Sequence, residues 1–139
     1  METEIQHIAH GVNCQNVMGS GVARALFEKW YVVKSEYHDM LNKIQPSETK
    51  YWLGTIQQVF CEEKIVYNLF TQNFYSNRKI RNANYASIAA CFKKLSEQGI
   101  KEVAIPRIGC GLAGGDWEVV KQIINDATLD DLDVYVYYL

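Results

Sequence analysis

The chain passes from a strand into a helix through a polar, glycine-rich segment, VNCQNVMGSG at residues 12–21. The apolar residues before it predict a short strand over residues 5–12. The apolar residues after it recur at helical spacing and predict a helix that begins near Ser20 or Gly21. Glycine lets the backbone approach a ligand closely, and the N–H groups at a helix N-terminus attract anions. The segment is therefore a candidate anion site.

A second turn of the same design is RIGCGLAGG at residues 107–115. A short apolar strand, VAIP at 103–106, precedes it, and a helix is expected over 116–126. Ligands of α/β sheets bind at the carboxyl ends of strands, so the two turns are expected to hold one phosphate-bearing ligand between them. The conformational freedom of glycine would explain either turn alone, and for the pair the structural and binding interpretations stay equally open.

The remaining elements predict an α/β domain with helices on both faces of one sheet. The expected elements are a helix at 35–44, a loop at 45–54, strands at 55–60 and 64–71, a helix that ends before Gly99, and a last strand at 133–139. Asn82 and Asn84 are both candidate caps for the helix before Gly99. A short polar connection joins the two middle strands into a hairpin, which makes the expected sheet mixed rather than purely parallel. A length of 139 residues suits a single domain over 1–139.

Composition limits the partners of the chain. The 14 basic and 16 acidic side chains give a net charge of −2, which provides no general attraction to nucleic acid or an anionic membrane. No run of apolar residues is long enough for a membrane-spanning helix. The four cysteines form no CxxC motif, so we expect no metal site, reduced thiols and a cytoplasmic protein.

GCGLAG at 109–114 matches the glycine pattern of dinucleotide-binding folds. That pattern should open a long doubly wound domain and be followed by an acidic residue at the end of the next strand. Here one strand remains, and Asp130, Asp131 and Asp133 precede it or open it. A nicotinamide-dependent dehydrogenase is therefore excluded.

The chain resembles a macro domain, of the branch that contains terminal ADP-ribose glycohydrolases and ADP-ribose-1″-phosphate phosphatases. The resemblance rests on IAHGVNCQNVMGSGVARAL at 8–26, YNLFTQ at 67–72 and IPRIGCGLAGGDWE at 105–118. It implies a three-layer α/β/α fold with a mixed central sheet and a pocket for ADP-ribose or a derivative. We expect a monomer that uses no cofactor.

The resemblance also implies a set of site residues. Asn13 matches the asparagine that contacts ribose, and His10 matches a histidine of the phosphatase-like members. The positions that match phosphate-facing residues are Gly19, Ser20, Gly21 and Val22 in the first turn and Ile108, Gly109, Cys110, Gly111 and Leu112 in the second.

Three departures from the family pattern narrow the expected chemistry. The N-terminal strand that ends in an adenine-binding acid is shortened or missing, because only a few residues precede the first predicted strand. Asn73 stands where the glycohydrolases carry a lysine, and Ala113 stands where they carry an acid. Without that lysine and acid, the lysine-dependent glycohydrolase route is disfavoured.

Each catalytic candidate has a structural alternative. His10 is a general acid or base, or a histidine hydrogen-bonded within the fold. Asp116 is a second acid–base group, or the cap of the helix that follows it. Asn13 aligns a ribose hydroxyl or a water, or its side chain shapes a turn. Cys110 is a nucleophile, or a small buried thiol.

The predicted function is ADP-ribose binding with hydrolysis of ADP-ribose 1″-phosphate, in which His10, Asn13 and Asp116 are catalytic. A de-ADP-ribosylating hydrolase that acts on a protein or nucleic-acid acceptor is one alternative. A non-catalytic reader of ADP-ribose-like nucleotides is the other.

Overall fold

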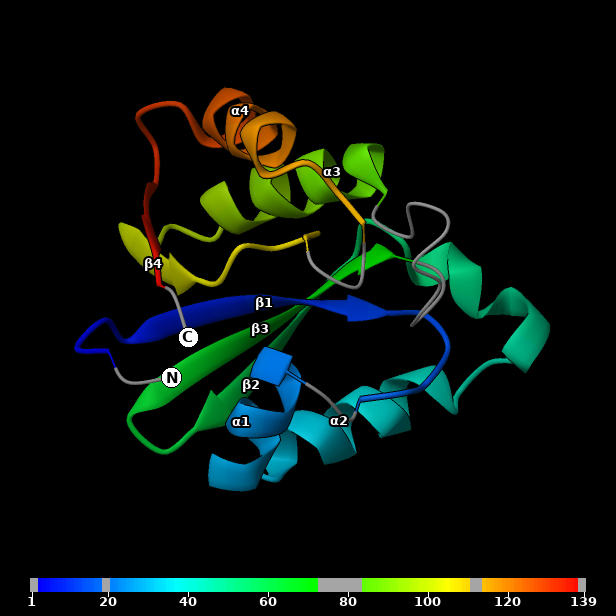
Figure 1. Ribbon diagram of the computed structural model, residues 1–139. Coiled ribbons are helices and arrows are strands. Elements are labelled where there is room, and N and C mark those ends of the chain that lie inside the picture. The colour runs from blue at the N-terminus through cyan, green and yellow to red at the C-terminus, as the bar shows by residue number, and fades with distance from the viewer. Residues whose placement is uncertain (1–2, 19–20, 73–83, 111–113, 138–139) are drawn as a thin grey trace.

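The computed structural model describes residues 3–18, 21–72, 84–110 and 114–137 (Figure 1). The elements in chain order are β1 (His7–Asn13), α1 (Gly21–Lys29), α2 (Val32–Leu41), the 3₁₀ helix η1 (Pro46–Trp52), β2 (Ile56–Cys61), β3 (Lys64–Gln72), α3 (Tyr85–Ser96), β4 (Glu102–Ile105), α4 (Trp117–Thr128) and β5 (Asp133–Val136). Residues 3–6, which precede β1, contain no strand. No helix in the described part of the chain is long and apolar enough to cross a membrane.

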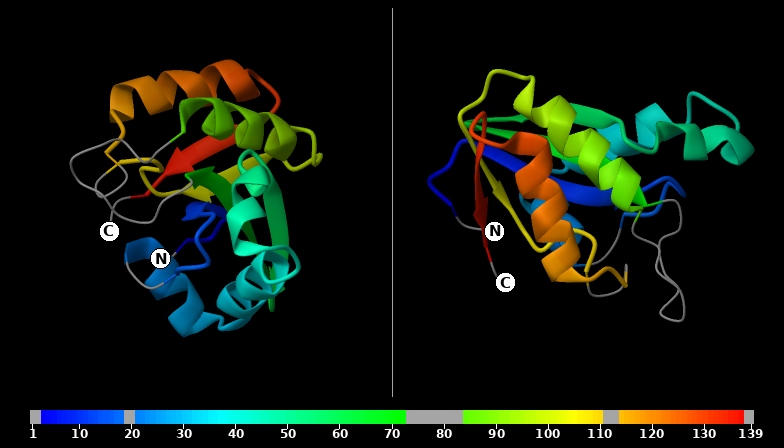
Figure 2. Two further views of the ribbon diagram at one scale, coloured as in Figure 1. Left: turned by 90° about the vertical axis from the view of Figure 1, so that its right-hand side faces the viewer. Right: turned by 90° about the horizontal axis from the view of Figure 1, so that it is seen from above.

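The strands form one sheet in the order β2-β3-β1-β4-β5. β2 is antiparallel to β3, and the other neighbouring pairs are parallel. Helices α1 and α2 cover one face, and α3 and α4 cover the other (Figures 1 and 2). The predicted three-layer architecture with a mixed sheet is therefore confirmed.

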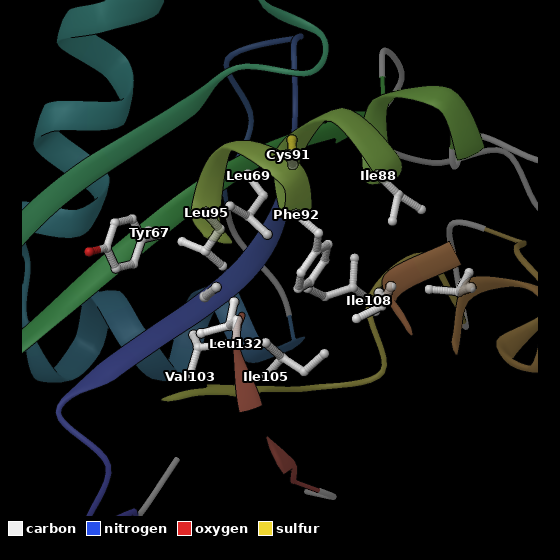
Figure 3. Packing of buried hydrophobic residues seen from close by; sticks show 13 residues of the cluster. Tyr67, Leu69, Ile88, Cys91, Phe92, Leu95, Val103, Ile105, Ile108 and Leu132 are labelled. Atoms are coloured by element: carbon white, nitrogen blue, oxygen red, sulfur yellow. The ribbon is translucent and has the colours of Figure 1, made fainter. Parts of the chain in front are cut away.

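The sheet separates two apolar cores. Leu69 of β3, Phe92 of α3 and Val103 of β4 are among the fully buried residues beneath α3 and α4 (Figure 3). Leu26 of α1 and Phe70 of β3 belong to the core beneath α1 and α2. Because both faces of β3 are covered, its nearly continuous apolar sequence is explained.

Residues 45–54 differ from the predicted loop because they contain η1. Pro46 opens η1, where a missing N–H costs nothing, and Gln45 before it is extended at φ −65° and ψ 143°. Trp52 at its end packs against the core beneath α1 and α2. The proline that suggested a loop therefore starts a short helix.

β1 lies between β3 and β4 and is parallel to both. The turn after β1 and the turn after β4 consequently leave the sheet at the same edge (Figure 1). Gly11 permits a close approach at this edge. A Cβ atom built at Gly11 would lie 2.6 Å from Thr71 Oγ1 and 3.2 Å from Ile108 Cγ2. The second turn thus begins against β1, beside the end of β3.

We predict that Gly11→Ala destabilises the protein by about 1–3 kcal/mol, because the added methyl group overpacks this contact. In a Thr71→Ala background the same change should cost less, since the closest atom, Thr71 Oγ1, is gone. Urea denaturation of the four proteins in this cycle measures both costs. Equal costs in the two backgrounds would show that the contact with Thr71 does not decide the need for glycine.

Candidate functional site

Asn13 ends β1, and its side chain organises the first turn. Its Oδ1 accepts hydrogen bonds from the Gln15 amide at 2.9 Å and lies 2.8 Å from the Tyr37 hydroxyl. Its Nδ2 donates to the Val17 carbonyl at 2.6 Å. Asn13 is 8% exposed, and both ends of its carboxamide are bonded within the protein. This is the turn-forming alternative, and a ligand contact by Asn13 stays a prediction.

Tyr37 of α2 holds the same turn through hydrogen bonds of its hydroxyl group. Its buried hydroxyl lies 2.9 Å from the Asn13 carbonyl oxygen and accepts a hydrogen bond from the Val17 amide at 3.1 Å. Burial raises the pKa of Tyr37, so the hydroxyl keeps its proton and donates it to Asn13. The sequence pattern places Tyr37 on the apolar side of a helix and gives no sign of this bond.

Asn16 is a site residue that the sequence reasoning missed. It adopts the left-handed φ of 63°, which is uncommon for a residue other than glycine. Two side chains of the α2 region hold it: His38 Nδ1 lies 2.5 Å from Asn16 Oδ1, and Asn16 Nδ2 donates to Asn42 Oδ1 at 2.8 Å. Asn42 follows the last residue of α2. The helix therefore fixes both the start and the middle of the first turn.

The first turn leads into α1, which begins at Gly21 as predicted. Gly21 has a φ of 60°, and a Cβ atom there would lie within 4 Å of no atom in the described part of the chain. Backbone conformation, rather than lack of space, explains the glycine at this position. Val22 packs against the core beneath α1 and α2. Gly19 and Ser20, the other predicted phosphate-facing positions, lie outside the described residues.

A main-chain hydrogen bond closes the second turn. Gly109 has a φ of 81°, and its carbonyl accepts a hydrogen bond from the Gly115 amide at 2.6 Å. Ile108 before it is buried, and its amide donates to the Pro106 carbonyl at 2.9 Å. This turn rests on β1 through Ile108 and Gly11. Gly111 and Leu112, like Ala113, lie outside the described residues, as do residues 73–83 with Asn73.

Cys110 lies half-buried in the second turn. Burial raises the pKa of its thiol, and the nearby Arg107 only partly offsets that effect. Its Sγ lies 3.7 Å from the Ile108 carbonyl oxygen. A thiol with a raised pKa carries little thiolate at neutral pH, so the arrangement favours the buried-thiol alternative over a nucleophile.

Asp116 caps α4, as one of its two predicted roles requires. Its Oδ1 accepts a hydrogen bond from the Glu118 amide at 2.9 Å, and its own amide donates to the Tyr85 hydroxyl at 3.1 Å. The carboxylate is exposed to solvent. Because its charge already lies at the N-terminus of α4, that helix end is less available to an anion than the start of α1. An acid–base role stays a prediction.

His10 lies in the middle of β1, 1% exposed, opposite Asn68 of β3. Asn68 Nδ2 donates to Gln57 Oε1 at 2.9 Å, so Asn68 Oδ1 is the oxygen that lies 2.5 Å from His10 Nε2. The ring therefore donates from Nε2, and its buried Nδ1 has no partner among the residues that the structure describes. Burial lowers the pKa of His10 to about 4. A ring that is neutral and shielded from solvent fits the structural alternative better than the predicted proton transfer.

We predict that His10 makes the protein less stable in acid. Its pKa is about 4 in the folded chain and about 6.5 in the unfolded chain, so the unfolded chain binds the extra proton first as pH falls. Stability should be full above about pH 6.5 and fall by about 2 kcal/mol by pH 5. Urea denaturation between pH 8 and pH 5 measures the loss, and His10→Gln should remove most of it.

The matched control is His7→Gln on the same strand. His7 is only partly buried, and although burial lowers its pKa, the nearby Glu102 opposes that shift. We therefore expect His7→Gln to retain most of the acid loss. An equal loss in wild type and His10→Gln would contradict the assignment to His10.

We predict that Tyr37→Phe loosens the first turn. The variant leaves the Val17 amide without this partner and costs about 1–3 kcal/mol of stability. Amide hydrogen exchange at Gln15 and Val17 should accelerate more than exchange in α3. Tyr67→Phe is the control, because the Tyr67 hydroxyl accepts only a 3.3 Å bond from Gln58 among the described contacts. Unchanged exchange at Val17 would show that Tyr37 does not hold the turn.

Comparison with known proteins identifies the family of the chain. The model of the Macro domain family matches residues 9–124. Over 133 residues the chain is 26% identical to a protein named ADP-ribose glycohydrolase OARD1 from Homo sapiens, a match that covers 95% of this chain and 81% of that protein. It is 25% identical over 159 residues to a protein named ADP-ribose 1″-phosphate phosphatase from Debaryomyces hansenii, with 95% and 88% covered.

A solved structure of a protein of unknown function from Bacteroides thetaiotaomicron has the same fold. Its TM-score is 0.85 at 31% identity, and the match covers 100% of this chain and 90% of that one. The family model spans both glycine-rich turns and most of the sheet. The chain belongs to the macro domain family.

Proposed function

We propose that the protein binds ADP-ribose between its two glycine-rich turns and hydrolyses ADP-ribose 1″-phosphate to ADP-ribose and inorganic phosphate. One observation carries the proposal: the turns leave neighbouring parallel strands at one sheet edge, and Ile108 of the second turn lies on Gly11 of β1. Two relatives, one named a glycohydrolase and the other a phosphatase, support it.

The ligand would be held mainly by the main chain. In the proposed complex the pyrophosphate accepts hydrogen bonds from amides of residues 19–22 and 108–112. The N-terminus of α1 adds the partial positive charge of its free N–H groups, and no acidic residue in its first turn offsets that charge. Tyr37 and Asn13 contribute by fixing the shape of the first turn. Backbone donors held in place stabilise charge that develops on the phosphoryl oxygens.

Hydrolysis requires a group that moves a proton. Water attacks the phosphorus atom, the bond from phosphorus to O1″ breaks, and O1″ leaves with a proton as the hydroxyl of ADP-ribose. Asp116 takes the proton from the attacking water and returns it to O1″, because its carboxylate is exposed directly after the second turn. His10 keeps β1 and β3 in register through Asn68 and is not a catalytic residue in this scheme.

Two alternatives use the same pocket. The relative named a glycohydrolase favours removal of ADP-ribose from a protein or nucleic-acid acceptor. Asn73 and Ala113 stand at the two positions where the glycohydrolases that the chain resembles carry a lysine and an acid. Their presence favours a non-catalytic reader. Binding of ADP-ribose is common to all three functions.

The test is release of inorganic phosphate from ADP-ribose 1″-phosphate. We predict release by the wild-type protein and a rate lowered by about tenfold or more in Asp116→Asn. Asparagine also caps helices, so this variant should stay folded, and calorimetry should show unchanged affinity for ADP-ribose. Asp130→Asn, at the far end of α4, is the matched control and should keep the wild-type rate.

Each outcome has one meaning. A full rate in Asp116→Asn would remove Asp116 from the mechanism. Binding of ADP-ribose without release would support the reader, or the second hydrolase if label is lost from an ADP-ribosylated acceptor. Absence of binding by every ADP-ribose derivative would overturn the proposed function.

A further inference from the structure

An open groove of about 690 Å³ lies between α3 and α4. Residues within 89–97 of α3 and its cap form one side, and residues within 123–131 of α4 and the segment after it form the other. The two helices lie side by side over the same face of the sheet (Figures 1 and 2). All residues that line the groove are exposed or half-buried, so it opens to solvent. We call it the α3–α4 groove.

The α3–α4 groove is separate from the proposed ADP-ribose site. The starts of the two helices meet beside the second turn, where the Asp116 amide donates to the Tyr85 hydroxyl at 3.1 Å. At a rise of about 1.5 Å per residue, Leu129 lies roughly 18 Å along the axis from the start of α4. No residue of either glycine-rich turn lines the groove. An inference about the groove therefore goes beyond the proposed function and does not depend on it.

The floor of the groove is apolar and consists mostly of small side chains. Ala89, Ala90 and Ala127 contribute methyl groups, and Ile123 contributes a larger apolar surface. All four residues are half-buried, so part of this surface still meets water. Ile123 and Ala127 are one helical turn apart, the spacing at which the apolar side chains of a second helix would meet them. The floor therefore suits a helix better than an extended chain.

Leu129 extends the apolar floor at the end of α4. Its side chain is 74% exposed, and its backbone has a φ of 46° and a ψ of −125°. Glycine is the usual residue where a helix ends with a positive φ, because it adopts this conformation without steric cost. Leucine at this position is strained and exposes apolar surface to water, so folding does not explain it. A partner that covers the side chain does.

The rim of the groove is negatively charged. The carboxylates of Glu97, Asp126 and Asp131 line it, against the single ammonium group of Lys93. Asp126 accepts a hydrogen bond from Gln122 at 2.9 Å, and none of the three carboxylates forms an ion pair with a described residue. Two copies of the chain that met through this face would bring two negative rims together, which disfavours a dimer. The same charge disfavours nucleic acid and attracts lysine and arginine.

We propose that the α3–α4 groove is a docking surface for a basic amphipathic helix of a partner protein. Apolar side chains one turn apart in that helix would pack on the alanine floor and against Leu129. Lysine or arginine side chains beside them would reach the three carboxylates of the rim. The apolar contacts provide affinity, and the charges select a basic partner over an acidic one.

The probe is an amidated helical peptide of about four turns, with leucine on one face and lysine on the other. In an amide NMR titration it should shift the resonances of residues 89–97 and 123–131. Binding should weaken as the salt concentration rises, because salt screens the attraction to the rim. A peptide of the same pattern with glutamate in place of lysine should bind at least tenfold more weakly.

Two variants test the two parts of the surface. Leu129→Gly keeps the backbone conformation and should raise the Kd of the lysine peptide by about tenfold, because the exposed leucine no longer packs on it. Tyr51→Ala, which removes another side chain that is 74% exposed, is its control. Glu97→Gln changes charge but not size, and should raise the Kd about threefold and reduce its salt dependence. Glu48→Gln in η1 is the matched control. Both controls should keep the wild-type Kd.

Three results would overturn the docking surface: shifts that leave out residues 89–97 and 123–131, the same Kd in Leu129→Gly and wild type, or equal binding of the lysine and glutamate peptides. Concentration-dependent shifts at these residues without any peptide would assign the groove to a second copy of the chain and would also overturn the proposal.

Discussion

The missing side chain at Gly11 sets the geometry of the candidate site. A Cβ atom there would fall 2.6 Å from Thr71 Oγ1 and 3.2 Å from Ile108 Cγ2, so a larger residue at position 11 would force these side chains to shift. Because β1 and β4 are parallel neighbours, the two glycine-rich turns that follow them leave the sheet at one edge. The contact at Gly11 packs the second turn against β1 there. A ligand between the turns would then be met by main-chain groups from both sides.

Helix α2 gives the first turn its shape. Tyr37, His38 and Asn42 bond to residues of the turn, which places a rigid helix beneath a segment that would otherwise have no regular structure. The helix that supports the proposed phosphate site is therefore part of the site, although no residue of α2 is expected to contact the ligand.

Much of the fold could be predicted because its elements are periodic and clearly bounded. The helix that begins near Gly21 and the hairpin of β2 and β3 follow from local sequence. Local sequence leaves Asn82 and Asn84 as candidate caps of α3, and the structure shows that Asn84 is the cap. The bonds of Tyr37 could not be predicted, because a tyrosine on an apolar stripe looks like any core residue until its hydroxyl meets Asn13 across 24 positions of the chain.

The same limit applies to the catalytic candidates. The sequence position of His10 predicts a place beside the first turn, but strand β1 directs its ring into the protein against Asn68. Asn16 gave no signal at all, since its left-handed backbone depends on partners from α2. Burial and backbone conformation are set by contacts between distant segments, so a motif identifies the turn but not which side chains face the ligand.

The most direct test of the account is the crystal structure of the protein with ADP-ribose. It should show the pyrophosphate within hydrogen-bonding distance of main-chain amides from both turns, at residues 19–22 and 108–112. A pyrophosphate that contacts only one turn, or binds elsewhere on the molecule, would contradict the claim that the two turns form a single site.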